Sequence, residues 1–210
     1  MQIRPARADD SDFLGWVIYA AARGQLARGW FDIVLERDEQ FCVAYCAELA
    51  RATARSWWHW SLFSVAEVDG KRAAGMCGFG DESVYGASSA AMAEASRKMG
   101  LSEEEHAQLW PRGSFILSCT TSEPGAWTIE NVATLPEYRG SGATQVLLQH
   151  ELARARAEGY TRAQITFLIG NAPAERAYIK AGFRFAEERR AAEFQTAISS
   201  PGLRRLSRNI

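Results

Sequence analysis

Residues 128–144 read TIENVATLPEYRGSGAT, in which a mostly apolar and β-branched run leads into a glycine-rich loop and a helix start. The pattern predicts a strand that ends at Thr134, a loop over residues 136–142 and a helix over residues 143–158. Glycines in such a loop let the backbone approach a ligand, and the free N–H groups of the first helical turn carry partial positive charge. Arg139 adds a full charge. The segment therefore predicts a site for a phosphate or pyrophosphate.

Two common phosphate-binding motifs do not fit this loop. No Gly-Lys-Ser/Thr follows, which excludes a P-loop, and Gln145 stands where a dinucleotide fingerprint has its third glycine. On the glycines alone, a tight strand-to-helix turn without any ligand is an equal alternative.

A second informative stretch lies downstream. Residues 171–183 read NAPAERAYIKAGF, with Asn171 as N-cap, a proline in the first turn and Gly182 at the end of the helix. A strand over residues 164–169 precedes it and another over residues 183–187 follows. Strands and helices that alternate in this way predict a mostly buried sheet with helices packed on it.

Both stretches resemble signatures of the GNAT acyltransferase superfamily. The acetyl-CoA-binding signature is Arg or Gln, two residues, Gly, one residue, then Gly or Ala; Arg139 and Gly142 match it, whereas Thr144 departs from it. The second signature is matched over residues 171–183. The resemblance is specific over residues 129–183 and only topological over residues 3–79. It implies an α/β fold with a mixed central sheet flanked by helices.

The resemblance also implies where acetyl-CoA, as co-substrate, would bind. Backbone N–H groups of the strand before the loop would polarise the thioester carbonyl, and pantetheine would lie where this strand and the next splay apart. Asn171 would touch the pantetheine arm, with a purely structural helix cap as the competing interpretation. The cofactor-binding residues so implied are Val132, Ala133, Thr134, Arg139, Gly140, Ser141, Gly142, Ala143, Thr144 and Asn171.

Tyr178 occupies the position of the general acid in this resemblance. It shares a helical face with Ala174 and Ala181, whose small side chains would leave room for the thiol end of the cofactor. A phenol stays protonated at neutral pH and can donate a proton to a thiolate. A packed core tyrosine is the alternative.

Glu130 is the candidate general base. Some polyamine-acetylating members of the superfamily carry a carboxylate at the similar place, nine residues before Arg139. Simple alternation along the strand predicts that Glu130 shares a face with Thr128, Val132 and Thr134. An exposed strand glutamate is an equally weighted alternative.

The remaining segments are assigned from pattern. Asp69-Gly70 between two apolar runs predicts a hairpin, and residues 81–113 are interpreted as an insertion in a single domain that covers residues 1–210. The other predicted elements are a strand over residues 3–7, a helix after residues 9–11, a helical stretch within residues 31–54, strands over residues 62–68, 72–79 and 115–119, and a tail after Arg190 without an obvious strand.

Composition narrows the class of protein. The 210 residues include 24 Lys+Arg and 25 Asp+Glu, giving a net charge of −1 and no electrostatic reason to bind nucleic acid or an anionic membrane. No apolar run reaches a membrane span and no signal-peptide core is present, so we expect a cytoplasmic protein. We expect no metal site, because the four cysteines, Cys42, Cys46, Cys77 and Cys119, show no paired spacing.

These observations predict an N-acyltransferase that moves an acetyl group from acetyl-CoA to an amine of a small molecule, peptide or protein. Two alternatives stay open: a non-catalytic acyl-CoA-binding module, and an enzyme acting on aminoacyl-tRNA, which the near-zero charge disfavours. The acceptor, the acyl-chain length and the oligomeric state, a homodimer included, are left open.

Three further clusters of residues are candidates for binding the acceptor or the cofactor. Residues 57–60, WWHW, could line an acceptor pocket, although closure of the core is the favoured interpretation. The acidic residues 103–105 could attract a cationic acceptor, and Arg204, Arg205 and Arg208 could reach the cofactor's 3′-phosphate; a solvated surface is favoured for both.

Overall fold

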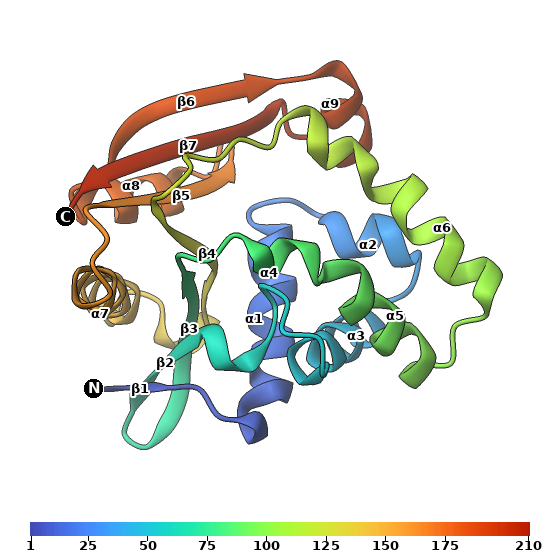
Figure 1. Ribbon diagram of the computed structural model, residues 1–210, viewed down its shortest axis with the longest axis horizontal. Helices are drawn as coiled ribbons and strands as arrows, with labels where there is room; N and C mark the ends of the chain where they lie inside the picture. Colours follow the sequence, from blue (N-terminus) through green and yellow to red (C-terminus); the bar gives the residue numbers. More distant parts are fainter.

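A computed structural model of the chain describes residues 1–210 and shows one seven-stranded mixed sheet (Figure 1). The strand order is β1-β2-β3-β4-β5-β7-β6, and β4 and β5 are the parallel pair. This confirms the predicted α/β class with a mixed central sheet flanked by helices. The strands are β1 (Gln2–Pro5), β2 (Phe63–Val68), β3 (Lys71–Phe79), β4 (Trp127–Thr134), β5 (Arg162–Leu168), β6 (Arg184–Arg190) and β7 (Gly202–Asn209).

Helices cover both faces of the sheet and divide the core into two main clusters. On one face, α1 packs against β3 and β4, α3 packs on α1 and α5 packs on α3, whereas α7 and α8 pack on the opposite face (Figure 1). The helices are α1 (Ser11–Arg23), α2 (Trp30–Leu35), α3 (Glu39–Arg51), α4 (Ser83–Gly86), α5 (Ser88–Lys98), α6 (Glu103–Gly113), α7 (Ala143–Ala157), α8 (Ala172–Lys180) and α9 (Ala192–Ile198). No helix combines the length and the apolar character that crossing a membrane would require.

Local sequence signals account for the N-terminal half. Leu14, Val17 and Ile18 form the fully buried stripe of α1, as the spacing predicts. Asp69 and Gly70 both have positive φ, which is the backbone of the predicted hairpin turn. The predicted helical stretch within residues 31–54 is two helices, because the chain turns at Glu36, which adopts a left-handed conformation after α2.

Residues 81–113 form α4, α5 and α6. Apolar side chains from all three helices, Val84, Met92 and Leu109 among them, complete the core cluster that α1 and α3 begin. The Tyr45 hydroxyl of α3 donates to the Met92 carbonyl at 3.1 Å. The segment interpreted as an insertion therefore shares its core with the rest of the chain.

Two predictions for the C-terminal half are wrong. Residues 114–118 form a 3₁₀ helix (η3) instead of a strand, because Phe115 packs edge-on against Phe194 of α9 and the turn hydrogen-bonds within itself. The C-terminal tail is not solvated, since β7 pairs along its whole length between β5 and β6. The sequence of β7 is polar because its charged side chains form ion pairs with neighbouring residues.

Gly78 of β3 is required by packing. The fully buried Glu151 of α7 lies against it: one carboxylate oxygen accepts a 2.6 Å hydrogen bond from Ser64, and the other lies 3.6 Å from Arg154. A Cβ at position 78 would stand 1.9 Å from that second oxygen and 2.8 Å from the indole nitrogen of Trp127. Neither group can withdraw, because both are fully buried.

We therefore expect Gly78→Ala to lower the free energy of unfolding by about 1–3 kcal/mol, the usual cost of overpacking a tight core. Urea denaturation followed by circular dichroism measures it. Gly86→Ala is the matched control, because a Cβ there meets nothing within 4 Å. Equal midpoints for the two variants would contradict the packing argument.

Candidate functional site

The site forms where β4 and β5 part. The two strands pair only from Trp127 to Ile129 on β4, opposite Ala163 to Ile165 on β5, although both continue beyond these residues. At the paired end, Gln164 donates to the Thr128 hydroxyl at 3.0 Å. The second half of β4, from Glu130 to Thr134, therefore has no strand partner on the side of β5.

A β-bulge lies at the point of separation. Cys77 of β3 is opposite Glu130 and Gly75 is opposite Ala133, so β4 contains one residue more than β3 between these two pairs. Asn131 absorbs the extra residue with φ of 50°, a left-handed conformation that Asn tolerates better than most residues. After the bulge, successive side chains of β4 therefore point to the faces opposite to those that regular alternation predicts.

The bulge corrects the predicted face of Glu130. Glu130 keeps the face of Thr128, but Val132 and Thr134 lie on the other face, toward α7 and α8, while Ala133 lies on the face of α1 and α3. Simple alternation fails because an extra residue shifts all following side chains by one. Glu130 thus belongs to the layer opposite that of Thr134.

The loop after β4 leaves its backbone donors free. Gly140 and Gly142 have φ of 83° and 86°, and the N–H groups of Gly140, Gly142 and Thr144 have no acceptor in the protein. A Cβ at either glycine would meet nothing within 4 Å, so backbone conformation and not crowding calls for glycine here. The side chain of Arg139 is exposed and forms no ion pair or hydrogen bond.

These donors stand at the start of the 15-residue helix α7, whose dipole adds partial positive charge. Thr144, the residue that departs from the signature, turns its hydroxyl to that of Thr134 at 2.9 Å. The hydroxyl pair joins the two ends of the loop. Thr144 is therefore accommodated by a contact with β4, which holds the loop closed at its base.

Glu130 is a carboxylate without a partner. Its side chain is half-buried, it accepts no hydrogen bond and forms no ion pair, and desolvation raises its pKa to about 8. A desolvated carboxylate of this kind, beside open backbone, is typical of a functional acid or base. Its charge lies within electrostatic reach of two tyrosines, Tyr178 and Tyr85.

Tyr178 faces the same region from α8. The residue is buried, its ring stands edge-on to Phe167 at 5.5 Å, and its pKa is raised by desolvation and then by the charge of Glu130. The phenol therefore stays protonated throughout the neutral range. Because β4 and β5 have parted, groups from the two layers come together here.

Two helix contacts hold Tyr178 in place. Gln145, in the first turn of α7, donates to the carbonyl of Ala177 at 2.7 Å and so links the glycine loop to the residue before Tyr178. Asn171 caps α8 by accepting from the Ala174 N–H at 3.2 Å, as predicted.

Sequence reasoning missed two residues of this site. Asn131 is buried, and its side-chain nitrogen has no partner, which leaves a donor beside the open half of β4. The bulge has a signal in the sequence: Asn131 is a residue type that tolerates positive φ, and the apolar positions after it no longer alternate in phase with those before it. In the sequence, Gln145 stands out only as a departure from a dinucleotide motif, whereas in the structure its amide links α7 to α8.

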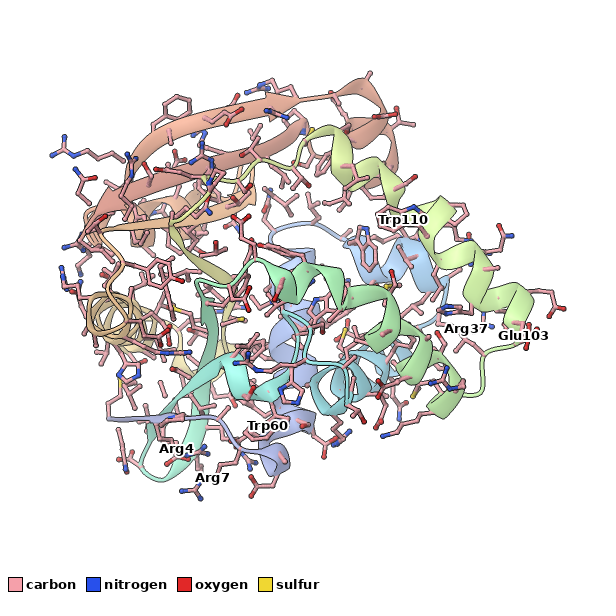
Figure 2. All side chains as sticks on the ribbon, in the orientation of Figure 1. Arg4, Arg7, Arg37, Trp60, Glu103 and Trp110 are labelled. Atoms are coloured by element: carbon pink, nitrogen blue, oxygen red, sulfur yellow. The ribbon has the colours of Figure 1, made fainter.

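Other clusters lie outside the site. Glu103 stands at the end of α6 that is remote from the sheet, with Arg37 close by (Figure 2), and Arg37 pairs with Glu105. The C-terminal arginines are engaged in the protein: Arg204 with Glu175 and Glu188, Arg205 with Glu123 and Glu187. All four cysteines are free and buried, and no group of three potential ligands could hold a metal ion.

Comparison with known families agrees with this geometry. The model of the acetyltransferase (GNAT) family matches residues 30–183, well over half of the chain. The chain therefore belongs to the GNAT family, which makes it an acyl-CoA-dependent acetyltransferase. The comparison with curated proteins gives no match.

Solved structures share the fold at low sequence identity. One described as an acetyltransferase is 19% identical, covers 100% of both chains and has a TM-score of 0.70. An N-acetyltransferase from Staphylococcus aureus Mu50 is 19% identical over 99% of this chain and 100% of that one, with a TM-score of 0.67. Rv2747 from Mycobacterium tuberculosis, solved in complex with CoA and NLQ, is 13% identical over 100% and 99%, with a TM-score of 0.51.

The raised pKa of Glu130 predicts a pH-dependent stability. Between the ordinary glutamate value of 4.5 and about 8, the unfolded chain loses this proton while the folded chain keeps it, so stability falls as pH rises through that window. Glu130→Gln removes this titrating group. From pH 5 to pH 9, the free energy of unfolding of the variant should therefore rise by on the order of 2 kcal/mol relative to that of wild type. Urea unfolding at both pH values measures it.

The exposed Glu193→Gln on α9 serves as the matched control for that measurement, and it should follow wild type at both pH values. A difference between Glu130→Gln and wild type that does not change with pH would contradict the assignment of a desolvated carboxyl.

Proposed function

We propose that this chain transfers an acetyl group from acetyl-CoA to a primary amine of a small molecule, peptide or protein by direct attack. The observation that carries the proposal is the pair of groups at the parting of β4 and β5. An unpartnered carboxylate, Glu130, and a phenol kept protonated, Tyr178, lie within electrostatic reach of each other beside the glycine loop. One can take a proton and the other can give one.

Free donors support the binding of acetyl-CoA. The open N–H groups of Gly140, Gly142 and Thr144, together with Arg139 and the α7 dipole, suit a pyrophosphate. The unpartnered side-chain nitrogen of Asn131 suits a carbonyl oxygen of the same ligand. In this proposal the cofactor-binding set is residues 132–134, residues 139–144 and Asn171.

The proton balance of the reaction assigns the two roles. Acetyl-CoA supplies an acetyl group activated as a thioester. Transfer to an amine forms a C–N bond and breaks the C–S bond, while one proton leaves the nitrogen and one goes to the sulfur. Glu130 takes the first proton, directly or through water, and Tyr178 donates the second. Backbone N–H groups near residues 132–134 stabilise the charge that develops on the carbonyl oxygen.

Acetyl-CoA binding tests the cofactor site. We expect calorimetric titration to show binding of acetyl-CoA and none of NADH, and we expect Arg139→Ala to weaken it about tenfold or more, because a charged contact to phosphate is lost. Arg184→Ala on β6 is the control: that side chain also lacks an ion pair but lies outside the glycine loop. Equal weakening by both variants would contradict the assignment.

Kinetics tests the catalytic pair. Tyr178→Phe should lower kcat about 100-fold and leave the affinity for acetyl-CoA unchanged, because only the proton donor is removed. Tyr160→Phe, in the connection between α7 and β5, where the ring packs edge-on against Trp127, should retain wild-type kcat. Thiol release on mixing with amines measures both, and wild-type turnover by Tyr178→Phe would exclude the acid role.

The same assay gives a pH profile. The base form of Glu130 is populated above its pKa, so kcat/KM should rise with pH through a step near pH 8 that Glu130→Gln abolishes. An unchanged step in Glu130→Gln would assign it to another group. Binding of acetyl-CoA with no turnover of any amine would favour a non-catalytic acyl-CoA-binding module.

A further inference from the structure

A continuous series of aromatic rings runs from α2 to the sheet. Neighbouring rings stand 4.7–6.1 Å apart between centroids, within the range of favourable aromatic pairs. In order, the rings belong to Trp30, Phe31, Trp58, Trp57, Tyr85 and Phe79. Most of this series is core, as predicted for residues 57–60, but its last members approach Glu130.

Strand register places the end of the series beside the carboxylate. Phe79 and Cys77 lie two residues apart on β3 and share a face, and Cys77 is directly opposite Glu130 on β4. The Cys77 thiol donates to the Trp57 carbonyl at 3.2 Å, which fixes Trp57 against the same face. Tyr85 contacts both rings, at 5.7 Å from Trp57 and 5.4 Å from Phe79.

Tyr85 is the member of this series that solvent reaches most. Its exposed fraction is 38%, whereas Phe79 and Trp58 are buried. The pKa of its hydroxyl is raised by desolvation and then by the charge of Glu130, which agrees with the strand register in placing Tyr85 near that carboxylate. The residue lies on α4, the first helix of the segment 81–113, which follows β3 in the chain and leads into α5 (Figure 1).

We propose that Tyr85 determines acceptor specificity, and that the acceptor is a primary amine that carries an aromatic group on a short chain. The inference rests on the proposed acetyltransferase function and identifies the acceptor class of that same site. The amine lies at Glu130, which takes its proton, and the aromatic group stacks on the ring of Tyr85.

The charges around Tyr85 favour an aromatic group over a second cationic group. Two acids lie on the same turn: Asp81, whose carboxylate accepts from the Ser83 N–H at 2.9 Å, and Glu82, whose charge also acts on Tyr85. Both are exposed, so solvent screens their charges. The positive charge of Arg55 acts on Asp81, on His59 and on Cys77. A distal ammonium would therefore meet only solvent-screened carboxylates, whereas an aromatic group meets an exposed aromatic residue.

The test compares acceptors on the full-length enzyme. Thiol release at saturating acetyl-CoA is measured with 2-phenylethylamine, n-butylamine and putrescine, for wild type, Tyr85→Ala and Tyr85→Phe. We expect wild type to prefer 2-phenylethylamine by about tenfold in kcat/KM over both aliphatic amines. Tyr85→Ala should remove this preference by raising the KM for 2-phenylethylamine, and Tyr85→Phe should retain it, because the ring makes the contact.

Phe185→Ala is the control variant, because Phe185 is another exposed aromatic residue, on the edge strand β6. It should keep the wild-type preference. A preference for putrescine, or a loss in Tyr85→Ala that is equal for all three amines, would overturn the inference and leave the acetyltransferase function standing. No turnover of any amine would overturn both, and the calorimetric titration with acetyl-CoA shows separately whether the cofactor site has failed.

Discussion

The parting of β4 from β5 is the constraint on which the site depends. Three residue pairs hold the strands together, and the bulge at Asn131 then turns the second half of β4 away from the regular ladder. Two consequences follow from this one irregularity. Backbone and side-chain donors on β4 are left without partners, and groups from opposite faces of the sheet can act on the same point. A regular ladder would have paired the donors and kept Glu130 and Tyr178 apart.

Electrostatics then gives the two side chains different roles. Desolvation raises the pKa of both Glu130 and Tyr178, but from different starting values, so one titrates near pH 8 and the other stays protonated. Neither effect requires a charged partner, and no positive group pairs with Glu130. The stability lost by burying an unpaired carboxyl is thus coupled to the role of base that we propose for it. The aromatic rings on the face of β3 that Glu130 shares include the one we assign to acceptor recognition.

Much of the site could be predicted from sequence because its signals are local. The glycine loop at residues 139–142, the Asn171 cap and the Asp69-Gly70 turn each depend on backbone conformations that few residues adopt, so their residue types reveal them. The order of strands and helices over residues 129–183 follows from periodicity. The family match covers a longer span, residues 30–183. The amphipathic stripe of α1 was likewise evident, since helical spacing needs only near neighbours.

The sequence by itself therefore determined the α/β class, the glycine loop proposed to bind phosphate and the identity of the candidate acid and base. Only the tertiary structure decided which face Glu130 occupies, because a bulge is a property of two strands paired together and not of one. The same holds for β7, whose polar residues form a strand because β5 and β6 supply its hydrogen bonds and its ion partners. The placement of Tyr85 beside Glu130 joins residues far apart in the chain. Contacts of that kind arise from packing, which no local pattern encodes.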